Sequence, residues 1–131
     1  MRLAYWFFFV AILAGLVGMG LGIHMGLAHD FTLMPVHAHV NLLGWASLFL
    51  YGLYYRVEPA AEATALAVVH FALAVAGVVL MTGGLTFMLL GNEALLPVTV
   101  VGSLSAVTAM AVFLVVVLRR GVAERGSATA R

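Results

Sequence analysis

Five histidines are the residues of this chain whose type and spacing could do chemistry. His24, His29, His37 and His39 lie within one short stretch, and His70 lies apart. Imidazole is a common ligand for heme iron, copper and zinc. Ionisable groups are costly in apolar membrane segments, where they tend to face a bundle interior or a cofactor. The histidines are therefore the first candidates for a functional site.

His37 and His39 stand at the start of an apolar segment, in the run HAHVNLLGW. With 3.6 residues per helical turn, side chains two positions apart point about 200° away from each other. Two histidines that bind one metal ion from a single helical face need a spacing of four, as in H-E-x-x-H. We therefore expect His37 and His39 to reach separate partners, on another helix of the same protomer or on another protomer.

The donor set favours heme over an isolated metal ion. A zinc site would need three or four converging ligands, preferably with thiolates or carboxylates. The chain has no cysteine, and its apolar segments hold no Asp or Glu. Heme b needs only one or two axial histidines and a large apolar slot. We predict His37 and His39 as axial ligands of heme iron, with Asn41, Trp45 and His24 as further cofactor-binding residues.

The other candidates also have purely structural readings. A lone histidine in a membrane helix often only hydrogen-bonds a neighbouring helix, which is the favoured reading of His70. His29, beside Asp30, is expected to face solvent. Aromatic residues near the arginine-rich ends of the segments suit an interfacial belt; they are Tyr5, Trp6, Tyr54 and Tyr55. A spaced glycine series favours close helix packing over a cofactor box; it comprises Gly15, Gly18, Gly22 and Gly26.

The elements that must position these residues are those of a membrane protein. The chain has 131 residues, of which 65% are hydrophobic and 8% charged, whereas a soluble domain is about a quarter charged. This composition excludes a soluble enzyme and a nucleic-acid-binding domain, and it makes the lipid bilayer a partner. Four apolar stretches reach the roughly 20 residues that a spanning helix needs; they are about 3–27, 35–55, 63–90 and 95–118.

We therefore predict an all-α membrane protein, a four-transmembrane-helix bundle over residues 1–120 with a disordered cytoplasmic tail at residues 121–131. With four spans, both termini and the loop after the second span share one side. All six basic residues fall on that side; they are Arg2, Arg56, Arg119, Arg120, Arg125 and Arg131. Because positive loops stay inside, we expect both termini to be cytoplasmic and the heme site to lie near the outer face.

The run HAHVNLLGW resembles the heme-copper oxidase catalytic subunit superfamily, including its nitric-oxide-reductase branch, and similar short four-helix bacterial membrane proteins. The resemblance covers the second apolar stretch well and the rest by helix count only. His39-x-Asn41 is similar to the H-x-N run on the low-spin heme helix of the nitric-oxide-reductase-like branch. In this family, a His-x-His helix lies between two hemes and holds one with each histidine.

The resemblance also implies an assembly in a bacterial inner membrane. The catalytic subunit of the family has twelve helices in three arcs of four, and this chain resembles one arc. We therefore expect a homotrimer in which His37 of one protomer and His39 of its neighbour bind the same heme b. Cyclic symmetry would then leave no histidine of the pair unused.

Departures from the family disfavour a complete oxygen reductase. The chain has no His-His pair, no helical His-x-x-x-Tyr motif after His37 or His39, and no Glu or Lys within its spans. The favoured function is a bis-His, low-spin heme b protein for electron transfer or redox and heme sensing, with quinol or a periplasmic cytochrome as partner. One alternative is a high-spin heme, or a heme with copper on His24 or His29, that acts on nitric oxide or oxygen; the support for copper is weak. Another alternative is a cofactor-free assembly or structural subunit.

Overall fold

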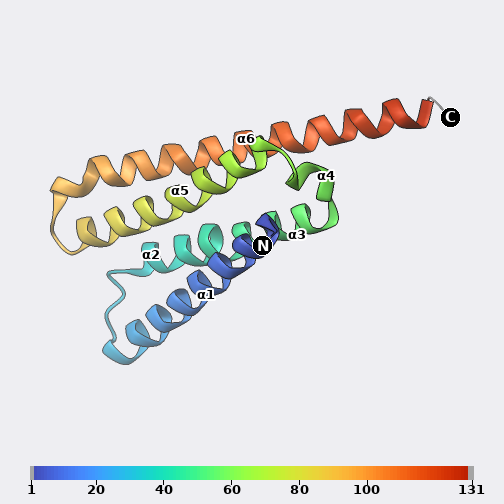
Figure 1. Ribbon diagram of the computed structural model, residues 1–131. Coiled ribbons are helices and arrows are strands. Elements are labelled where there is room, and N and C mark those ends of the chain that lie inside the picture. The colour runs from blue at the N-terminus through green and yellow to red at the C-terminus, as the bar shows by residue number, and fades with distance from the viewer. Residues whose placement is uncertain (1, 130–131) are drawn as a thin grey trace.

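The computed structural model describes residues 2–129, with side chains described for residues 2–123. Within that range every regular element is helical, as Figure 1 shows. In chain order the elements are α1 (Leu3–Ala28), α2 (Met34–His39), the π-helix η1 (Val40–Ser47), α3 (Leu48–Val57), α4 (Pro59–Glu62), α5 (Ala65–Leu89), the 3-10 helix η2 (Glu93–Leu95) and α6 (Leu96–Thr129).

Three of the helices are long and apolar enough to cross a membrane: α1, α5 and the stretch Glu93–Ala123 of η2 and α6. Large apolar side chains cover their surfaces, and Leu27 and Val107 are 80% and 69% exposed. Extensive exposed apolar surface is typical of proteins that contact lipid. The predicted all-helical class is confirmed, and the three helices agree with a membrane protein; a fourth span stays a prediction.

The second predicted span, at residues 35–55, is a run of three consecutive helical elements, α2, η1 and α3. It is not α-helical throughout, because residues Val40–Ser47 form π-helical turns. Within them the Ser47 hydroxyl donates to the Leu42 carbonyl five residues back, at 2.8 Å. Gly44 passes tightly between neighbours there, since an added Cβ would lie 2.8 Å from the Cβ of Ala14. Hydropathy alone does not distinguish α from π turns.

The C-terminal segment also differs from the prediction. α6 continues to Thr129, so most of residues 121–131 extend the helix instead of forming an irregular tail. Residues 130 and 131 lie outside the described residues. Once a long helix exists, each further residue adds a hydrogen bond without a new nucleation cost, and the Ala, Arg and Glu residues of this segment are good helix formers.

The helices form two antiparallel pairs, α1 with the α2–η1–α3 run and α5 with α6. Figure 1 shows the α1–α2 and η2 connections at one end, and α4 with the N-terminus at the other. Short polar contacts fix α4 at that second end. Glu62 Oε1 accepts a hydrogen bond from the backbone N–H of Ala4 at 2.9 Å, and Glu58 forms an ion pair with Arg120 at 3.1 Å.

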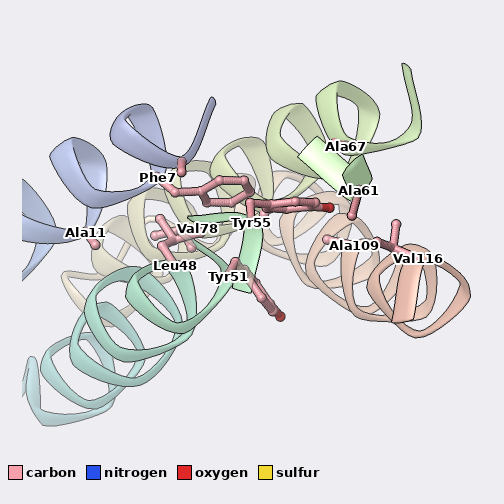
Figure 2. Close-up of a cluster of buried hydrophobic side chains, with 12 residues drawn as sticks. Phe7, Ala11, Leu48, Tyr51, Tyr55, Ala61, Ala67, Val78, Ala109 and Val116 are labelled. Atoms are coloured by element: carbon pink, nitrogen blue, oxygen red, sulfur yellow. The ribbon is translucent and has the colours of Figure 1, made fainter. Parts of the chain in front are cut away.

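The two pairs meet in an aromatic core. The rings of Phe7 from α1 and Tyr55 from α3 are stacked, with centroids 5.5 Å apart (Figure 2). Small residues complete this core, and among them Ala67 and Ala109 are buried on α5 and α6. The helices α5 and α6 pack closely at Gly77, where an added Cβ would lie only 2.7 Å from the backbone nitrogen of Ala106.

Candidate functional site

His37 lies in α2 and faces α1. Its Nδ1 atom is 2.9 Å from the backbone carbonyl oxygen of Gly18. A carbonyl oxygen can only accept a hydrogen bond, so the ring proton of neutral His37 lies on Nδ1 and the Nε2 atom carries a lone pair. This tautomer is the one in which Nε2 can bind a metal.

The glycine face of α1 makes room for His37. An added Cβ at Gly22 would lie 2.9 Å from the Cε1 atom of His37. The prediction that this glycine series is a close-packing face is therefore confirmed here, although nothing lies within 4 Å of an added Cβ at Gly26. The same face packs against two further predicted residues. An added Cβ at Gly18 would lie 2.6 Å from Asn41 Oδ1, and an added Cβ at Gly15 would lie 3.0 Å from Trp45 Cδ1.

Asn41 lies one turn after His37 and supports it. Its Nδ2 atom donates to the backbone carbonyl of His37 at 2.8 Å and lies 3.4 Å from each ring nitrogen. Asn41 and Trp45 also line a surface groove of about 210 Å³ between α1 and η1. The other walls of this groove are apolar; they come from Ile12, Gly15, Leu16 and Met19.

His39 is half-buried and has a different partner from His37. Its Nδ1 atom lies 2.7 Å from the backbone carbonyl oxygen of Pro35, one turn earlier in the same helix. The proton of the neutral ring is therefore on Nδ1, and Nε2 again carries the lone pair. Since the two histidines are two positions apart on α2, their side chains lie on nearly opposite sides of that helix.

His24 and His29 are exposed near the end of α1. His29 terminates α1 in the left-handed conformation, with φ of 51°. The next residue, Asp30, accepts hydrogen bonds from the backbone N–H and the hydroxyl of Thr32, at 2.9 and 2.6 Å. These bonds, the hydroxyl foremost, hold the pKa of Asp30 below its ordinary value. Among the described residues no three His, Cys, Asp or Glu side chains gather into a group that could hold a metal ion.

His70 is enclosed at the centre of the bundle. Its side chain is fully buried, and its Nδ1 atom lies 3.0 Å from the Tyr55 hydroxyl. Its Nε2 atom has no hydrogen-bond partner. Rings from α1, α3 and α6 surround the imidazole, with centroids at 5.4 Å for Phe7, 4.5 Å for Tyr51 and 5.2 Å for Phe113. This environment agrees with the packing interpretation of His70.

Sequence reasoning placed Tyr55 in an interfacial belt, and this was wrong because Tyr55 is fully buried. It also missed the Tyr55–His70 pair. The spacing along the chain gave no signal for this pair, because Tyr55 lies four residues before α4 whereas His70 lies eight residues after it. The Gly18 carbonyl was missed as well, since no side chain identifies it.

The chain matches no protein-family model, and searches of curated proteins and of solved structures find no match either.

Proposed function

We propose that this chain is a b-type heme protein of the membrane, with His37 and His39 as axial ligands of low-spin heme iron. The observation that carries this proposal is the pair of Nδ1 hydrogen bonds to the carbonyls of Gly18 and Pro35. Both bonds leave Nε2 as the electron-pair donor, and a metal-binding histidine usually donates its other ring N–H to an acceptor such as a backbone carbonyl.

The donor set suits a macrocycle better than a bare ion, because heme b needs at most two axial ligands and an apolar wall. An apolar groove lies beside Asn41 and Trp45, one and two turns after His37, although neither His37 nor His39 lines it. His39 lies on the other side of α2 from His37. One protomer would therefore hold a heme with His37 while its His39 serves a neighbouring protomer's heme, which is the arrangement of the proposed homotrimer.

The protein groups have defined tasks in this proposal. The Gly18 and Pro35 carbonyls hold each imidazole by its Nδ1–H, which orients the ring and raises the basicity of Nε2. Asn41 fixes the backbone of His37. Bound heme would supply reversible one-electron chemistry, for electron transfer or for redox and heme sensing. Quinol or a periplasmic cytochrome is the proposed partner, because α2 begins at the end of the bundle opposite the arginines.

The test is the visible spectrum of the detergent-purified protein, oxidised and then reduced with dithionite. We expect a sharp reduced α-band that carbon monoxide does not change. His37→Ala and His39→Ala should each abolish this low-spin spectrum, whereas His29→Ala should preserve it because His29 is an exposed helix end. An unchanged spectrum in both His37→Ala and His39→Ala would refute the ligand assignment.

One observation favours a cofactor-free alternative. His37 fills the space over Gly22 and hydrogen-bonds α1, which is also what a helix-packing residue would do. A protein that stays colourless after expression with added heme precursor would support a structural or assembly subunit. A reduced spectrum that shifts with carbon monoxide would instead support a high-spin heme that acts on nitric oxide or oxygen.

A further inference from the structure

A second groove lies at the opposite end of the bundle from His37. It has a volume of about 190 Å³ and lies between α4, the start of α5 and the last described side chains of α6. One face of α6 forms one wall of the groove, with Val116, Arg119, Arg120 and Ala123. The last three residues follow Val116 by three, four and seven positions, so all four lie on one side of the helix. The opposite wall comprises Ala60, Ala61, Thr64 and Leu66.

The groove is apolar at one end and cationic at the other. Val116 is buried and Leu66 is half-buried, whereas Arg119 one turn after Val116 is exposed. The apolar side chains are therefore nearer the middle of the bundle, and the guanidinium groups are nearer its end. This order matches an amphiphile with a hydrocarbon chain and an anionic head.

The two arginines of the groove differ in their partners. Arg120 donates from Nε and Nη2 to Glu58 Oε2, at 3.2 and 3.1 Å, so its charge is compensated. Among residues 2–123 no hydrogen-bond or ion-pair partner is found for Arg119. Within the side chains that the structure describes, Arg119 therefore presents an uncompensated positive charge and a fork of N–H donors at the mouth of the groove, and such a fork fits two oxygens of a phosphate.

We propose that this groove binds an anionic phospholipid, with Arg119 on the headgroup phosphate and an acyl chain along Val116 and Leu66. Basic pockets between membrane helices are known to recognise anionic headgroups through charge and hydrogen bonds. The helices beside the groove are long and apolar enough to lie in a bilayer, so lipid is the phosphate-bearing amphiphile available to it. The proposal does not depend on the heme assignment.

The test is native mass spectrometry of the full chain in mild detergent, with phosphatidylglycerol or phosphatidylcholine added at equal concentration. Phosphatidylglycerol adducts should exceed phosphatidylcholine adducts on the unaltered protein. Arg119→Gln should reduce phosphatidylglycerol binding about fivefold, the usual effect of one basic residue near an anionic surface. Binding of phosphatidylcholine should not change.

Arg56→Gln is the matched control. Arg56 is also exposed and lies at the end of α3, and its replacement removes the same charge without touching the groove. We expect Arg56→Gln to bind phosphatidylglycerol like the unaltered protein. Equal losses of phosphatidylglycerol binding in the two variants would overturn the proposed site and indicate an effect of general surface charge. Equal binding of the two lipids by the unaltered protein would also overturn it, because the groove would then show no preference for an anionic headgroup. Helical circular dichroism of both variants verifies that they fold.

Discussion

The Nδ1 contacts distinguish the histidines of this chain from one another. His37 and His39 each face a backbone carbonyl, at 2.9 and 2.7 Å, which leaves Nε2 as a donor atom for a metal. The partner of His70 is the Tyr55 hydroxyl, which can donate or accept. Aromatic rings also surround His70, so its environment agrees with packing, whereas His37 and His39 are the proposed heme ligands.

Gly22→Ala should disturb His37 specifically. The new methyl would lie 2.9 Å from the imidazole Cε1 atom, so the ring must tilt and its bond to the Gly18 carbonyl must weaken. Loss of such a supporting contact typically weakens metal binding by roughly tenfold or more. We expect a heme titration of the purified variant to give a dissociation constant roughly tenfold or more above that of the unaltered protein.

Gly20→Ala is the control for this change. Gly20 also lies inside α1, but nothing lies within 4 Å of its added Cβ. The gain in helix propensity is the same in both variants, so only the contact with His37 differs. Equal heme affinity in Gly22→Ala and Gly20→Ala would contradict the role given to the α1 glycine face.

At the level of elements, each antiparallel pair packs closely at a glycine on one of its two helices. His37 faces Gly22 across the α1–α2 loop, and Gly77 faces Ala106 across the connection before α6. In both cases a glycine lets the partner helix approach closely. The position of His37 therefore depends on the loop that sets the register between α1 and α2.

That loop should respond to acid through Asp30. Hydrogen bonds from Thr32 lower the pKa of Asp30 below its ordinary value of 3.8. The carboxylate therefore stabilises the loop above pH 3.8, and this contribution is lost as the pH falls through the lowered pKa. Thr32→Val removes the hydroxyl donor, and the pKa of Asp30 should rise toward 3.8 in an NMR titration of its carboxyl carbon.

Thr86→Val serves as the control for the titration, because the Thr86 hydroxyl donates to the Thr82 carbonyl within α5 at 2.7 Å. The pKa of Asp30 should not change in this variant. The same Asp30 pKa in Thr32→Val and in the unaltered protein would show that the backbone N–H alone lowers it.

For the whole molecule, the proposed homotrimer makes a prediction about mixed protomers. If His37 of one protomer and His39 of the next bind the same heme, neither His37→Ala nor His39→Ala alone forms a complete site. Co-expression of the two variants should restore heme, because a mixed ring contains an intact His37–His39 pair at an interface. The measurement is the low-spin spectrum of the co-purified protein, with native mass spectrometry for the number of subunits.

The same experiment has a clear negative result. If each heme lay within one protomer, no combination of the two variants would hold a complete site. Absence of heme in a co-purified mixed assembly would therefore refute the shared site, while the single-variant spectra would still report on the ligands themselves.

The sequence alone was sufficient for the helical class and for the membrane-length helices α1, α5 and α6, because length and hydropathy are properties of a local segment. It also singled out His37, His39, Asn41 and Trp45 as candidate site residues, since their types and spacing are visible without packing. Only the tertiary structure decided the π turns after His39, the Gly18 carbonyl acceptor and the buried Tyr55–His70 pair. These features arise where two helices press together, and the contact of distant residues sets their geometry.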